Sequence, residues 1–171
     1  DLAGLDDDAN QYERASALYE KSLKLLDARS DSDPRDVARI LVRLGFAYRQ
    51  TGQAATAEAR LLRALRICET QQPPVPLRVA YILGSLSEVY LHMNRLKDAE
   101  TALLRARELT VKLDRSTYNE SGGYLQTLAR LGGLYSRTAR EDSARQVLKE
   151  VVEQRKALLG ADHPKVAEDL E

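Results

Sequence analysis

The sequence is short of several residue types, and each shortage excludes a class of protein. Its 171 residues include one cysteine, Cys68, so no intrachain disulfide framework can form and an unoxidised, cytoplasmic compartment is expected. No apolar run approaches the ~18 residues that a membrane-spanning helix needs. The 26 basic and 26 acidic residues cancel, so no overall charge draws the chain to nucleic acid or to an anionic membrane. Only nine glycines and five prolines occur and strand-like alternation is absent, which favours long helices.

Candidate catalytic and metal-binding residues are equally scarce. A cysteine nucleophile needs a base within ~3 Å, and His92 is expected roughly 18 Å from Cys68, at 1.5 Å of helix rise per residue. The other histidine, His163, is expected in a loop two repeats away, and two histidines so far apart predict no metal site. No glycine-rich phosphate loop is present. We therefore expect a chain without enzymatic activity, cofactor or metal, in which Cys68 is a buried structural thiol.

One spaced set of residues occurs three times, and it is a packing pattern. Each set has a leucine, a small residue and a tyrosine three positions on, followed by an alanine, a leucine and a further small or apolar residue. The sets have identical internal spacing and start 42 and then 45 residues apart. Their members are Leu44, Gly45, Tyr48, Ala57, Leu61 and Ala64; Leu86, Ser87, Tyr90, Ala99, Leu103 and Ala106; and Leu131, Gly132, Tyr135, Ala144, Leu148 and Val151. A period in this range indicates a solenoid, in which each repeat buries its apolar face against its neighbours.

Capping and turn residues divide the array into repeats. Asp33 can cap a helix that begins at Pro34, Gly52 can form the turn inside the repeat, and Pro76 begins the next repeat. We expect one array over 1–171, with a partial repeat at 1–31, complete repeats at 33–74, 75–116 and 117–161, and the start of a further repeat at 162–171. Because both ends then fall inside repeats and no signal-like segment opens the chain, we expect it to be a piece of a longer array.

The same residues predict the helices and how they pack. The expected ranges are 11–29, 34–51, 54–71, 76–92, 96–113, 118–137 and 141–159. Gly122 and Gly123 are costly inside a helix, which favours a longer loop before the third complete repeat. The small residues of the first helices are expected to face alanines of the second helices, pairing Gly45 with Ala57, Ser87 with Ala99 and Gly132 with Ala144.

This pattern resembles the tetratricopeptide repeat, and the long period resembles its kinesin-light-chain type. The run from Leu158 to Ala167 carries the same resemblance, with echoes at 33–38 and 76–80; Tyr124 and Leu125 depart from it. The resemblance implies an all-α, right-handed solenoid of antiparallel helix pairs whose first helices line a concave groove. It also implies a non-catalytic scaffold that binds a peptide or an extended segment of a partner protein there.

The resemblance further implies which residues face the groove. They are Arg39, Phe46, Arg49 and Gln50 in the first complete repeat, Tyr81, Glu88, Leu91 and His92 in the second, and Gln126, Ser136 and Arg137 in the third. Three arginines outnumber the one glutamate, which favours a ligand with acidic residues. The alternative is that these arginines are ordinary solvated surface. The lysine and asparagine set that clamps chaperone tails is missing, so chaperone tails are not expected as ligands.

Two other functions fit the sequence. The array can self-associate through its ends, where Val166 and Leu170 are apolar, or it can serve as a sensor or regulatory arm of a larger enzyme or signalling ATPase. A nucleic-acid site is not favoured: the arginine stripe formed by Arg60, Arg63 and Arg66 is bracketed by glutamates, which predicts a solvated helix face.

Overall fold

The chain folds into a stack of helices. The computed structural model describes residues 2–111, 123–160 and 163–164, with the backbone alone for residues 2–9 and 158. Seven helices and no strand occur in this part: α1 (Leu2–Asp27), α2 (Pro34–Gln50), α3 (Ala54–Glu69), α4 (Pro76–His92), α5 (Leu96–Val111), α6 (Tyr124–Arg137) and α7 (Glu141–Leu159). None of the described helices is long and apolar enough to cross a membrane. The predicted repeat start at 162–171 lies outside the described residues except for 163–164.

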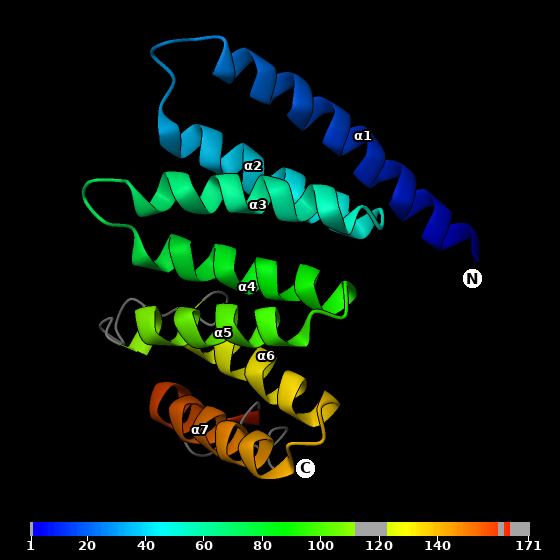
Figure 1. The fold of residues 1–171 in the computed structure, drawn as a ribbon. Helices are drawn as coiled ribbons and strands as arrows, with labels where there is room; N and C mark the ends of the chain where they lie inside the picture. The colour runs from blue at the N-terminus through cyan, green and yellow to red at the C-terminus, as the bar shows by residue number, and fades with distance from the viewer. Residues whose placement is uncertain (1, 112–122, 161–162, 165–171) are drawn as a thin grey trace.

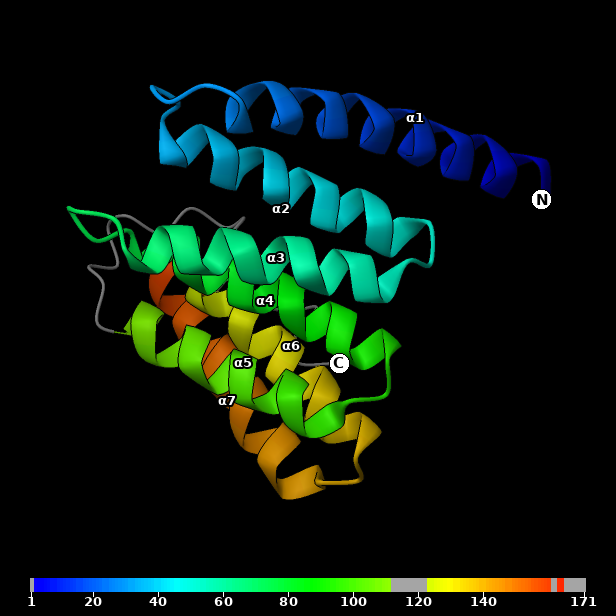
Figure 2. The ribbon, with the colours of Figure 1, turned by 45° about the horizontal axis from the view of Figure 1, so that its top comes forward.

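Helices that follow each other in the sequence pack side by side (Figures 1 and 2). The pairs α2–α3, α4–α5 and α6–α7 form the repeats, and α1, α3 and α5 each pack against the first helix of the next repeat. Each repeat therefore contacts its neighbours along the chain, which confirms the predicted all-α solenoid.

The helix ends are mostly where the capping residues predict them. The Oδ1 atom of Asp33 accepts a hydrogen bond of 2.8 Å from the backbone N–H of Arg35, and Pro34 is the first residue of α2. Pro76 is likewise the first residue of α4. Proline suits this position because an N–H in the first turn of a helix has no partner within the helix.

Two helix starts differ from the prediction. α1 begins at Leu2 instead of near residue 11, and it runs through Asn10, which lies one repeat before the turn residue Gly52. α6 begins at Tyr124, directly after Gly123, as expected from the cost of glycine inside a helix; the predicted start near residue 118 lies outside the described residues.

The turn inside each repeat is a Schellman motif. One residue adopts a positive φ: 73° at Gly52, 56° at Asn94 and 54° at Ala139. The N–H of the following residue donates to the carbonyl oxygen of the repeat tyrosine, at 2.8, 2.8 and 2.9 Å in successive repeats. Glycine accepts this conformation freely, whereas alanine loses roughly 1–2 kcal/mol there. The turn geometry is thus kept even where the residue is unfavourable.

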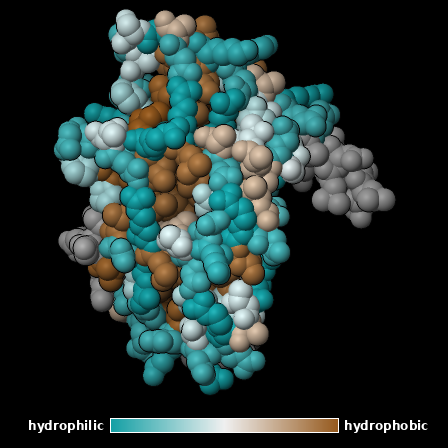
Figure 3. All heavy atoms as spheres, in the orientation of Figure 1, coloured by the Kyte–Doolittle hydropathy of each residue, from teal (hydrophilic) through white to brown (hydrophobic). Residues whose placement is uncertain are grey.

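The repeated residue set forms the core. Ala57, Leu61 and Ala64 are at most 1% exposed, and so are their equivalents in α5. Leu148 of α7 is 48% exposed, because the described residues place a first helix on only one side of α7. On the face seen in Figure 3, apolar side chains show between rows of polar ones, as expected for a core one helix layer thick.

Close approach of the two helices of a repeat depends on a glycine. A Cβ atom at Gly45 would lie 2.5 Å from Cγ of Leu61, so the nearest neighbour of Gly45 is Leu61 and not the predicted Ala57. At Gly132 the corresponding distance, to Cδ2 of Leu148, is 3.4 Å. Ser87 is fully buried, and its hydroxyl donates to the Gly84 carbonyl at 2.6 Å. The first complete repeat is therefore the one that most requires a residue without a side chain.

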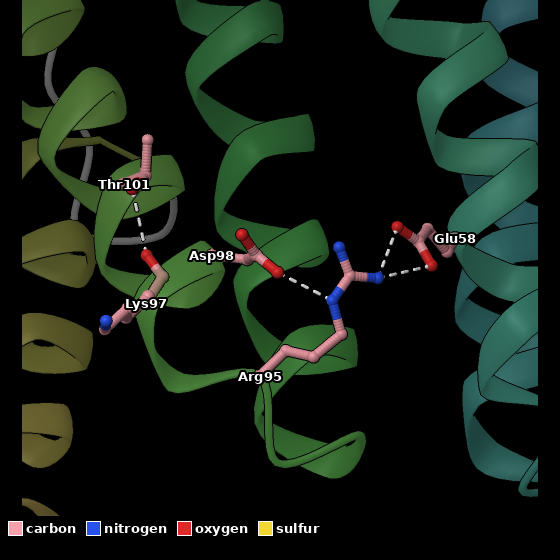
Figure 4. A network of polar contacts seen from close by, with 5 residues as sticks. All are labelled: Glu58, Arg95, Lys97, Asp98 and Thr101. Carbon is pink, nitrogen blue, oxygen red and sulfur yellow. Dashed lines mark hydrogen bonds and ion pairs between the residues drawn. The ribbon is translucent and has the colours of Figure 1, made fainter.

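A polar contact joins each repeat to the previous one. The Arg95 guanidinium lies 4.5 Å from the ring centroid of Tyr90 and donates to both carboxylate oxygens of Glu58 at 2.8 and 2.9 Å, and to Asp98 at 2.6 Å (Figure 4). Burial, with the carboxylate of Glu58 adding to it, raises the pKa of the Tyr90 phenol. The next repeat has the same arrangement, made by Arg140, Tyr135 and Glu100.

The arginine stripe of α3 contributes to another such contact. Arg60 and Tyr48 both donate to Oε1 of Glu20 on α1, at 3.1 and 2.9 Å, and Arg63 pairs with Asp27 at 2.5 Å. Two of the three stripe arginines therefore hold α3 to α1, so the solvated face that the sequence predicts is partly a repeat-to-repeat contact.

The glycine contacts give a first prediction. Gly45→Ala is expected to destabilise the fold by about 1–3 kcal/mol, because the added methyl overpacks against Leu61. Gly133→Ala is expected to stabilise it by about 0.5–1 kcal/mol, because no atom lies within 4 Å of its Cβ position and alanine is the better helix former. Urea unfolding of both variants measures the difference. Equal stabilities would contradict the close approach at Gly45.

Candidate interaction groove

The first helices lie closer together than the second helices. The backbones of α2 and α4 approach each other, whereas α3 and α5 are joined by a side-chain ion pair, that of Arg105 with Glu69. Arg130 of α6 reaches Glu88 of α4, so the same side continues into the third complete repeat. In a curved stack the elements on the inner side approach each other, and α2, α4 and α6 therefore line the concave side.

The part of this side nearest the N-terminus is hollowed. A cavity of about 520 Å³ opens between α1, α2 and α4. Phe46 and Tyr81 are 46% and 44% exposed there, and the Phe46 ring meets that of Tyr12 edge to face with centroids 5.6 Å apart. The walls include Tyr12, Ala15 and Tyr19 of α1, Arg39, Val42, Arg43 and Phe46 of α2, and Arg78 and Tyr81 of α4. Aromatic rings in a hollow of this size can enclose one or two apolar side chains of a ligand.

Positive charge is concentrated on the first helices. α2, α4 and α6 together contain seven arginines and only two acidic residues, in a chain whose net charge is zero. Arg39, Arg43 and Arg78 line the hollow, and no acidic residue does among those whose side chains the structure describes. Arg39 pairs with Asp36 at 2.5 Å, but both side chains are largely exposed, so this pair is weak. The groove is a basic surface on a neutral protein.

Arg49 and Glu88, both predicted to face the groove, bind each other. Their ion pair measures 3.2 Å, and Arg130 pairs with the other oxygen of Glu88 at 2.5 Å. The Arg49 guanidinium also lies 5.3 Å from the centroid of the Phe46 ring. Arg49 is therefore engaged with its neighbours and is not the simple solvated arginine of the alternative interpretation.

The other predicted groove residues are dispersed. Gln50 and His92 are exposed at the last turns of α2 and α4, Arg137 is exposed at the end of α6, and Leu91 and Gln126 are half-buried. Ser136 lines a separate hollow between α6 and α7 and donates to the Gly132 carbonyl at 3.0 Å. Only Arg39, Phe46 and Tyr81 of the predicted set meet in the hollow near α1.

Three arginines of the groove were missed by reasoning from the sequence, namely Arg43, Arg78 and Arg130. The available signal was the charge of each helix taken separately, since the excess of arginine is confined to the first helices.

Cys68, the residue considered as a nucleophile, lies apart from the groove. Cys68 is 1% exposed in the core, and burial raises the pKa of its thiol, which agrees with a structural role. Among the described residues no group of three or more histidine, cysteine, aspartate or glutamate side chains is arranged to hold a metal ion.

Comparisons with known proteins identify the repeats. Two family models, each described as a tetratricopeptide repeat, match residues 36–112 and 125–165. No curated protein matches the chain. Among solved structures 42 chains match.

Two of these solved structures illustrate the similarity to this chain. Nearly identical TPR-like repeats, described as those of a kinesin light chain from Podospora anserina, superpose with a TM-score of 0.74 at 20% identity, over 98% of this chain and 81% of that one. BtubC (BKLC) from P. vanneervenii superposes with a TM-score of 0.55 at 19% identity, over 95% of this chain and 80% of that one. At these identities the likeness shows a shared fold.

The ion pairs give a second prediction. Arg49→Gln is expected to destabilise the fold by roughly 1–3 kcal/mol, because it removes an ion pair in which the Arg49 side chain is only 17% exposed. Arg137→Gln, on exposed surface, is expected to change stability by no more than about 0.5 kcal/mol. Urea unfolding compares them, and the account of Arg49 fails if the two variants are equally stable.

Proposed function

The chain belongs to the tetratricopeptide-repeat family, whose members are generally non-catalytic protein-interaction scaffolds, and we propose that it binds an acidic, extended segment of a partner protein along the concave side formed by α2, α4 and α6. The observation that carries the proposal is the charge of these helices, seven arginines against two acidic residues. Arginine binds carboxylates through two parallel hydrogen bonds, which gives both affinity and orientation.

The hollow between α1, α2 and α4 supports the proposal and adds an apolar requirement. Phe46 and Tyr81 offer exposed rings beside Arg43 and Arg78. A segment with an apolar side chain next to acidic residues would place the first among the rings and the second against the guanidinium groups. Self-association through the ends of the array and a role as the regulatory arm of a larger enzyme remain predictions from the sequence.

The third prediction tests this function without a known partner. Peptides selected on the chain from a random phage-displayed library are expected to be acidic with at least one apolar residue. Arg43→Glu combined with Arg78→Glu is expected to weaken their binding by roughly tenfold or more, because it reverses two charges at the hollow. Fluorescence polarisation with the labelled peptides measures the dissociation constants.

A matched control separates the groove from overall charge. Arg66→Glu combined with Lys97→Glu makes the same change in net charge on exposed positions of α3 and α5. This control is expected to alter the affinity by less than about twofold, since charges outside the groove are screened by salt. If both double variants lose binding equally, or if the selected peptides are not acidic, the proposed function is wrong.

A further inference from the structure

Three charged side chains from three successive repeats meet on the concave side. Arg49 of α2, Glu88 of α4 and Arg130 of α6 are 17%, 29% and 18% exposed in their side chains. Nη2 of Arg49 lies 3.2 Å from Oε2 of Glu88, and Nη2 of Arg130 lies 2.5 Å from Oε1. One carboxylate is therefore held between two guanidinium groups, and the group of three keeps a net positive charge.

Gly84 makes this arrangement possible. A Cβ atom at position 84 would collide with Nη1 of Arg130, so the guanidinium of Arg130 lies against the α4 backbone where a side chain would otherwise stand. Glycine is unfavourable inside a helix, and Gly84 lies in the middle of α4. A side chain at position 84 would therefore require the Arg130 guanidinium to shift.

The two arginines have unused capacity for an anion. Each guanidinium carries five N–H donors, and the contacts to Glu88 use only part of them. The partial burial of all three side chains strengthens electrostatic interactions relative to open water. Glu88 has the chemistry of an acidic ligand residue and occupies the position that such a residue would take.

We propose that Arg49 and Arg130 form the carboxylate-binding site of the groove and that Glu88 is its built-in competitor. An acidic residue of the ligand binds the two guanidinium groups in place of the Glu88 carboxylate, which turns towards solvent. This inference rests on the proposed function, since it names the point in the same groove where an acidic side chain binds. Glu88 then lowers the affinity of any ligand that must displace it from the two arginines. A ligand without a carboxylate gains nothing by displacing it.

The fourth prediction uses a fluorescein-labelled octaglutamate peptide as the probe and octaglutamine as its neutral counterpart. Glu88→Gln is expected to tighten octaglutamate binding by roughly tenfold, the value of one charged hydrogen-bonded pair, and to leave octaglutamine binding unchanged. Adding Arg130→Gln to the Glu88→Gln variant is expected to cancel the gain, because it removes the Arg130 guanidinium from the site. Fluorescence polarisation gives the affinities, and circular dichroism checks the fold of each variant.

Glu100→Gln is the matched control. Glu100 is also paired with an arginine and its side chain is 25% exposed, but it joins α5 to the Arg140 contact and does not line the groove. Removing its charge is expected to change octaglutamate affinity by less than about twofold. An equal gain in both variants would overturn the proposal, because the cause would be net charge.

The outcomes separate this proposal from the proposed function. If Glu88→Gln fails to tighten octaglutamate binding while Arg43→Glu with Arg78→Glu still weakens the selected peptides, the groove stands and the competitor role of Glu88 is wrong. If octaglutamate binds neither the natural chain nor the Glu88→Gln variant, the carboxylate site is likewise wrong, and the selected peptides alone decide the proposed function.

Discussion

Each second helix must bury one face between first helices, and the rest of the structure depends on this requirement. The face of α3 carries Ala57, Leu61 and Ala64, which are almost completely buried. Such a face is covered by the first helix of its own repeat and by the first helix of the next. The core therefore extends in one direction only, and stability is expected to be close to a sum of repeats and their interfaces. Leu148, at the equivalent position of α7, is half-exposed where the described residues provide only one covering first helix.

This packing leaves the inner side of the first helices free to carry charge. Ion pairs between repeats, such as Arg95 with Glu58, involve exposed or half-exposed side chains and add at most about 1 kcal/mol each. These ion pairs instead fix how successive repeats are placed relative to one another. The Arg49–Glu88–Arg130 contact differs because it lies on the concave side and leaves positive charge unbalanced. In the proposal made above, the same three side chains join successive repeats and bind the ligand.

The sequence predicted the fold well, because its signals are local. Asp33 with Pro34, Gly52 and Pro76 mark helix ends that depend on capping and backbone conformation, and the structure has them at these positions. The start of α1 was missed because the helix runs through Asn10, one repeat before Gly52, where the later repeats turn. The groove was predicted less well. Arg49 and Glu88 were both identified, but Arg130, which pairs with the other oxygen of Glu88 from one repeat farther on and lies where Gly84 has no Cβ, was not. Contacts of this kind follow from the placement of three helices, which no local pattern encodes.

Hydrogen–deuterium exchange of the chain with and without a selected acidic peptide tests the central claim most directly, because it reports which helices the ligand covers. The account predicts that exchange slows in α2, α4 and α6, most strongly around Arg43, Arg78 and Glu88, while α3, α5 and α7 are little affected. Protection centred on the second helices, or confined to α1 and α7 at the ends of the array, would contradict the claim that the concave basic side is the binding surface.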